Sequence, residues 1–96
     1  MRRFSRSARR QTGRELFRLQ AGENPLDWKP MRSIGAGTCE IRVHAENEYR
    51  VIYVAKFSET LYVLHAFTKK TPATSLDDVR LAKRRYQEME QARKQR

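Results

Sequence analysis

The sequence predicts one small α+β domain over residues 1–96, with an antiparallel sheet of three or four strands, one or two N-terminal helices and a C-terminal helix. Two observations predict this class. Hydrophobic residues have helical spacing at both ends of the chain and alternate in the middle, and the alternating runs are joined by connections of hairpin length. A chain this short buries only about 60–65% of the surface that it exposes when unfolded, which leaves no room for a second core.

A short amphipathic helix is predicted over residues 7–20. Its apolar residues sit among arginines that give the helix a basic, solvated side: Ala8, Leu16, Phe17 and Leu19. Ser7 is the predicted N-cap and Gly22 the predicted residue just beyond the helix end. Residues 23–30 then contain two prolines, so we expect a loop with a single helical turn, anchored in the core by Trp28.

Three strands are predicted over residues 40–44, 49–55 and 61–67, joined by connections 45–48 and 57–60. Period-two alternation places Cys39, Ile41 and Val43 on one face of the first strand, and Glu40, Arg42 and His44 on the other. An antiparallel meander is the simplest arrangement of these strands. After residue 72 the spacing becomes helical again: Ser75 and Asp78 form a capping box, and an apolar stripe follows at Val79, Ala82, Tyr86 and Met89.

The charge is strongly positive and unevenly distributed. Lys and Arg number 21 against 11 Asp and Glu, a net charge of +10. Residues 1–18 carry +6 and residues 69–96 carry +5, whereas residues 19–68 carry −1. Such a surface predicts a polyanionic partner.

Cys39 is the only cysteine, and no apolar run is long enough to span a membrane, so we expect a cytoplasmic protein with no membrane partner.

The predicted strands and the turn after them project several cations, and cations from neighbouring strands can converge on one phosphate. Arg50 shares a strand face with Ile52, Val54 and Lys56, and His65 is expected to share one with Leu61, Val63 and Phe67. Two simpler interpretations stay open. In the first, Arg50 forms a salt bridge with Glu40 or Glu48 across the hairpin, and in the second, His65 is a core histidine with a satisfied hydrogen bond.

Other kinds of chemistry find little support in the sequence. There is no carboxylate pair in an apolar setting and no Gly-x-Ser-x-Gly elbow. Gly35-Ala36-Gly37 lacks the lysine of a phosphate loop. The two histidines are too few and too isolated for a metal site, so neither a metal nor a cofactor is expected.

Four segments in unbroken order carry a family resemblance: residues 26–31, 35–42, 49–53 and 64–71, with the motifs Glu-x-Arg, Tyr-Arg-Val and His-x-Phe-x-Lys-Lys-Thr. Together they resemble the phage-derived HigB-like branch of the RelE/ParE toxin superfamily, and the likeness covers roughly residues 4–90. Members of this family normally begin with a β-strand before the first helix. This chain starts almost at the helix, so either its start is assigned too late or the RelE-like sheet lacks that strand. The loss of the strand would leave a sheet edge unpaired.

The resemblance implies the toxin of a type II toxin–antitoxin pair, a ribosome-dependent endoribonuclease that cleaves mRNA and inhibits translation. The implied partners are mRNA, the ribosome and a helix-turn-helix antitoxin, with operator DNA contacted only through the antitoxin complex. The family's usual carriers of activity correspond to Arg42, Arg50, His65, Lys69 and Lys70. Lys56 is a weaker candidate.

We expect cleavage without metal, with the RNA 2′-hydroxyl attacking the phosphorus, and Arg42, Arg50 and Lys69 converging on the phosphate. Either Lys69 or Lys70 is the expected base, and His65 the proton donor or an orienting group. The expected RNA-binding residues are Lys56, Arg80, Lys83, Arg84 and Arg14, although a solvated helix face explains those of the C-terminal helix equally well. Two other functions stay open: a non-catalytic ParE-like toxin that inhibits DNA gyrase, and a simple nucleic-acid-binding module.

Overall fold

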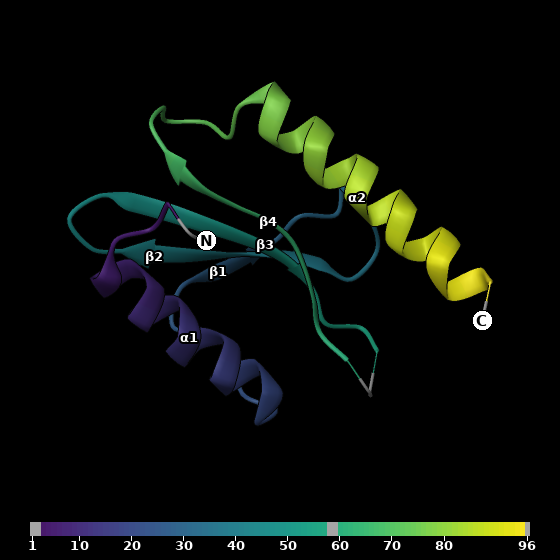
Figure 1. Ribbon diagram of the computed structural model, residues 1–96, viewed down its shortest axis with the longest axis horizontal. Coiled ribbons are helices and arrows are strands. Elements are labelled where there is room, and N and C mark those ends of the chain that lie inside the picture. Colours follow the sequence, from purple (N-terminus) through teal and green to yellow (C-terminus); the bar gives the residue numbers. More distant parts are fainter. Residues whose placement is uncertain (1–2, 58–59, 96) are drawn as a thin grey trace.

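A computed structural model describes residues 3–57 and 60–95 (Figure 1). The elements in chain order are α1 (Arg6–Gln20), β1 (Trp28–Pro30), β2 (Thr38–His44), β3 (Glu48–Val54), β4 (Tyr62–Lys69) and α2 (Leu76–Lys94). The strands form one antiparallel sheet in the order β1-β2-β3-β4. This confirms the predicted α+β class and meander. Ser58 and Glu59, in the predicted connection 57–60, lie outside the described residues, as do Met1 and Arg2.

The two helices cover opposite faces of the sheet (Figure 1). On the α1 face, Phe4 and Ala8 pack with alternate strand residues such as Ile41 and Val51. On the α2 face, Ala82, Tyr86 and Met89 pack with the other set, which includes Ile52 and Val54. Because side chains alternate along a strand, each face has its own apolar cluster, and the molecule has three layers.

Helix α1 begins earlier than predicted. Its N-cap is Ser5, whose side chain accepts a hydrogen bond from the amide of Ala8 at 3.1 Å, so the prediction of Ser7 is wrong. Ser5 has the extended backbone that an N-cap requires, whereas Ser7 lies inside the helix. Phe17, predicted on the apolar side, is 70% exposed because the sheet contacts the side of α1 that carries Ala8 and Leu16.

The segment predicted as a loop with a helical turn contains strand β1 instead. Lys29 pairs with Glu40 of β2, and the amide of Arg42 donates to the carbonyl of Asp27 at 2.9 Å, which continues the pairing. Strand β1 lies at the sheet edge, where Pro30 needs no ladder donor. Trp28 is 37% exposed, so it does not anchor the core as predicted.

A register shift in β4 changes one predicted face. Val63 pairs with Tyr53 but His65 pairs with Ile52, so Leu64 is an extra residue between them. Val63 and Leu61 therefore do not share a face with His65. Leu64 and Phe67 pack in the α2 cluster, whereas Leu61 packs against the α1 cluster.

The strand that the sheet has in addition to the three predicted ones is β1, and it does not precede α1. Residues 3–5, the described residues before the helix, form no strand, and β1 follows the helix.

At the other end of the chain, the predicted cap of α2 is confirmed: Ser75 accepts from the amide of Asp78 at 3.1 Å, and its hydroxyl donates to the Asp78 carboxylate at 2.7 Å. None of the helices in the described residues has the length and apolar character needed to cross a membrane.

Candidate functional site

The strand register gathers cations at one end of the α2 face, beyond the start of α2. Arg42 of β2 lies directly opposite Arg50 of β3, and Arg50 lies opposite Phe67 of β4. In the next row outward, His44 lies opposite Glu48, which lies opposite Lys69. The residues of β3 that pack under α2, Ile52 and Val54, lie beyond Arg50 toward the other end of this face.

Three cations meet at one carboxylate oxygen. Oε1 of Glu40 lies 3.6 Å from Nε of Arg50, 3.8 Å from Nε of Arg42 and 4.0 Å from Nζ of Lys29. We call Lys29, Arg42, Arg50 and Lys69 the cation cluster. Glu40 has no exposed surface and the Arg50 side chain is 7% exposed, while the Arg42 side chain is 33% exposed. The cluster therefore runs from the interior to the surface.

Two half-exposed carboxylates lie at the outer side of the cluster. Oε1 of Glu48 is 3.6 Å from NH1 of Arg50, and Oδ1 of Asp27 is 3.9 Å from NH1 of Arg42. Both salt bridges considered for Arg50, to Glu40 and to Glu48, are thus present. Any phosphate that reaches the terminal guanidinium nitrogens competes with Asp27 and Glu48.

His44 joins these two carboxylates. Its Nε2 lies 2.7 Å from Asp27 and its Nδ1 lies 2.7 Å from Glu48. When both ring nitrogens donate, the imidazole must be protonated. The hydrogen bonds from Asp27 and then Glu48 raise the pKa of His44, and the same contacts lower the pKa of each carboxyl. We call this arrangement the His44 clasp.

Lys69, the last residue of β4, and Lys70, which follows it, differ in their surroundings. Partial burial, followed by repulsion from Arg50, lowers the pKa of Lys69. The attraction of Glu40 acts in the opposite direction and is weaker. Lys70 is exposed and lines a cavity of about 700 Å³ together with His65, Phe67 and Asp78. Lys69 therefore belongs to the cation cluster, whereas Lys70 lies at the neighbouring cavity.

His65 has a defined partner. Its Nε2 lies 2.7 Å from Oδ1 of Asp78, and its ring stacks on Phe67 with centroids 4.9 Å apart. The other oxygen of Asp78 accepts from Ser75, so the cap of α2 orients the carboxylate that orients the histidine. The interpretation of His65 as a histidine with a satisfied hydrogen bond is therefore correct in its geometry. The ring is 13% exposed and faces the same cavity as Lys70.

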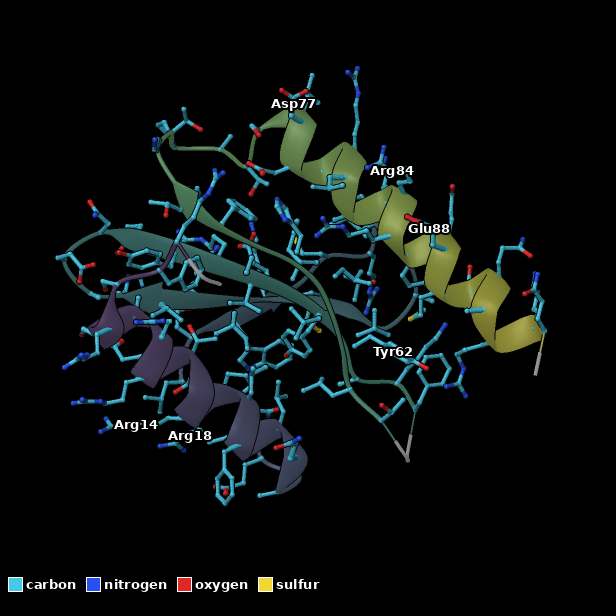
Figure 2. All side chains as sticks on the ribbon, in the orientation of Figure 1. Arg14, Arg18, Tyr62, Asp77, Arg84 and Glu88 are labelled. Carbon is cyan, nitrogen blue, oxygen red and sulfur yellow. The ribbon has the colours of Figure 1, made fainter. Side chains whose placement is uncertain are left out.

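The predicted RNA-binding residues do not form one surface. Arg80, Lys83 and Arg84 are exposed on α2, whereas Arg14 is exposed on α1. Figure 2 shows Arg14 and Arg84 on opposite sides of the molecule. Lys56 donates to the hydroxyl of Tyr86 at 2.9 Å, and Tyr86 donates in turn to the carbonyl of Ala36 at 2.8 Å. Lys56 thus helps to hold α2 against the 35–37 turn.

Several residues of the site were not singled out from the sequence. Lys29 lies in the segment that the two prolines predict as a loop, and the β1–β2 pairing brings it to Glu40. Asp78 was identified as a cap but not as the partner of His65, which is 13 residues away. No local pattern encodes either contact.

Among residues 3–57 and 60–95, no group of three His, Cys, Asp or Glu side chains is arranged to hold a metal ion.

The fold and the site define a small α+β protein with a cationic end on one face of its sheet. The chain belongs to the Gp49-like family of phage-derived proteins, because the family model described as Phage derived protein Gp49-like (DUF891) matches residues 1–87. Membership is compatible with the toxin of a toxin–antitoxin pair, and so with an antitoxin partner. A search of curated proteins and a search of solved structures each found no match.

Proposed function

We propose that this chain is the toxin of a type II toxin–antitoxin pair, of the HigB-like branch, and that it cleaves mRNA on the ribosome without a metal ion. A helix-turn-helix antitoxin encoded beside it would hold it silent, and operator DNA would be contacted only through the complex of the two. Family membership supports the toxin class. The cation cluster supports the chemistry.

One observation carries the proposal: Lys29, Arg42 and Arg50 come from three different strands and lie within 4.0 Å of the same oxygen atom. Lys69 of the fourth strand is close enough for repulsion from Arg50 to lower its pKa. Like charges repel, so a group of four cations is favoured only where anions balance them. The carboxylates Asp27 and Glu48 are partly exposed and can be exchanged for a phosphate.

The proposed reaction begins when the RNA 2′-oxygen attacks the adjacent phosphorus, and it ends when the bond to the 5′-oxygen breaks. Arg42 and Arg50 stabilise the charge on the phosphorane because guanidinium groups bind phosphate oxygens and remain charged. Lys69, whose pKa is lowered, accepts the proton of the 2′-hydroxyl. His65, oriented by Asp78, donates a proton to the leaving oxygen. The products are a 2′,3′-cyclic phosphate and a 5′-hydroxyl.

The direct test is the Arg50→Ala variant in a translation extract, with mRNA cleavage mapped by primer extension. Removing one preorganised charge from such a site costs about 10²–10³ in rate, so we expect cleavage to disappear. Arg32→Ala is the matched control, since Arg32 is an exposed arginine in the turn after β1. Circular dichroism verifies that both variants are folded. Full cleavage by Arg50→Ala would remove Arg50 from the site.

A parallel supercoiling assay with purified DNA gyrase distinguishes the other toxin class. The proposal predicts that the wild-type protein cleaves translated mRNA and leaves supercoiling unchanged. Inhibition of gyrase without mRNA cleavage would assign the chain to the non-catalytic toxins. Harmless expression in bacteria, with neither activity, would leave a nucleic-acid-binding module.

A further inference from the structure

Glu40 is the buried carboxylate that the cation cluster contacts, and its place in the sheet explains its contacts. It lies on β2 between Lys29 of β1 and Ile52 of β3, with no exposed surface. Its Oε1 faces the three cations, and its Oε2 lies 3.4 Å from the hydroxyl of Thr74, in the segment that leads from β4 to α2. A phosphate in solvent cannot replace a carboxylate at this depth.

The energetics of this burial point to a role beyond surface pairing. A buried carboxylate is costly unless cations and hydrogen bonds compensate for its lost hydration. Here the compensation comes from the Nε atoms of Arg42 and Arg50, both of which are buried. Distances of 3.6–3.8 Å are ion-pair distances, longer than hydrogen bonds. The attraction is therefore electrostatic and common to both arginines.

The two ends of each guanidinium group have different partners. The inner Nε atoms face Glu40, which is inaccessible, whereas the outer NH1 atoms face Asp27 and Glu48, whose side chains are 40% and 45% exposed. An anion from solvent can displace the outer carboxylates and leave the inner one in place. The inner contact is common to both arginines, and NH1 of Arg50 also donates a hydrogen bond to the carbonyl of Tyr49 at 3.0 Å.

We propose that Glu40 is a positioning residue that holds Arg42 and Arg50 by their inner edges, so that their outer nitrogens act on one phosphate. The proposal rests on the proposed function for its activity measurement. It also predicts that the Nε–H protons of Arg42 and Arg50 exchange slowly with water, and this property does not depend on any reaction. Glu40 itself does not touch the substrate.

The first test follows the arginine side chains directly. In protein labelled with ¹⁵N-arginine, the Nε–H protons of Arg42 and Arg50 should exchange slowly with water, because Glu40 holds them inside. The Glu40→Gln variant should speed this exchange at least tenfold. Glu88→Gln, which removes an exposed carboxylate on the outer side of α2, is the matched control and should leave it unchanged (Figure 2). Unchanged exchange in Glu40→Gln would overturn the proposal.

The second test separates positioning from simple binding. Glu40→Gln should lower mRNA cleavage at least tenfold, while inorganic phosphate binds as tightly as to the wild type or more tightly, since a negative charge has been removed. Phosphate binding that weakens in parallel with cleavage would contradict a positioning role. If the wild type cleaves nothing but the exchange result holds, the proposed function fails and the role of Glu40 stands.

Glu40→Gln leaves Arg50 with one carboxylate fewer, and the removal of one partner from a buried ion pair destabilises a fold. Melting temperatures in phosphate and in chloride at equal ionic strength address this case. We expect phosphate to raise the melting temperature of Glu40→Gln at least twice as much as that of the wild type, because the uncompensated arginines then bind the anion. An equal effect of the two salts on the variant would indicate a purely structural carboxylate and overturn the proposal.

Discussion

At the scale of single residues, burial decides which ion pairs are fixed and which are exchangeable. Arg50 is 7% exposed and pairs with Glu40 inside and Glu48 outside, so the two partners weighed from the sequence are both correct. Alternation predicted that Glu40 and Arg42 share one strand face, and the strand register places Arg50 directly opposite Arg42. It could not predict that Glu40, on the same face, would be fully buried, because that depends on neighbours supplied by β1 and by Thr74.

The His44 clasp gives a pH dependence with a definite sign. The pKa of His44 is raised above its ordinary value of 6.5, so the protonated ring stabilises the folded state. This contribution is complete below the ordinary value and is lost as the pH rises through the raised one. Because the ring is 53% exposed, solvent screening keeps the contribution below about 1 kcal/mol.

An NMR titration of the His44 ring checks this prediction. We expect a midpoint above 6.5 in the wild type and a lower midpoint in Asp27→Asn, since the hydrogen bond to Asp27 is the largest cause of the shift. Glu48→Gln should lower the midpoint by less. A wild-type midpoint at or below 6.5 would show that the clasp does not form.

At the scale of elements, single side chains fix the N-terminus of each helix and the segment before β1. Ser5 and Ser75 cap the two helices. The carboxylate of Glu15 accepts from the amide of Leu26 at 2.7 Å, which ties the segment before β1 to α1. The sequence motifs predicted the cap of α2 because a capping box is local. They missed β1 because a strand of three residues has too little alternation to recognise.

The 35–37 turn offers a sharp test of packing. A Cβ at Gly35 would lie 2.4–2.6 Å from ring atoms of Tyr86, so Gly35→Ala must displace the ring. Overpacking of this kind costs about 1–3 kcal/mol. Gly13→Ala is the matched control, because a Cβ at Gly13 in α1 meets nothing within 4 Å. It should stabilise the protein by about 0.5–1 kcal/mol.

Urea denaturation of the two alanine variants measures both effects. The free energy of unfolding should fall in Gly35→Ala and rise in Gly13→Ala. Equal changes in the two variants would contradict the close packing of the turn against α2. The experiment also bears on the Gly-Ala-Gly sequence, whose role here is to admit Tyr86 and Lys56 rather than a phosphate.

At the scale of the whole molecule, the charged ends predicted from composition separate in space. Helix α1 lies on one face of the sheet and α2 on the other, so Arg14 and Arg84 cannot contact the same short stretch of RNA (Figures 1 and 2). Net charge predicted a polyanionic partner but not this division. The hairpin lengths predicted the order of β2, β3 and β4, but Lys29 joins the cation cluster only through β1, which was not predicted.

The central claim is that the cation cluster binds a backbone phosphate, and a crystal structure with a short 2′-O-methyl RNA tests it most directly. The methyl group blocks the attacking oxygen, so the RNA stays intact. We predict one phosphate within hydrogen-bonding distance of both Arg42 and Arg50, with Asp27 and Glu48 displaced and Glu40 unmoved. RNA bound elsewhere, with the two arginines still paired to Asp27 and Glu48, would contradict the account.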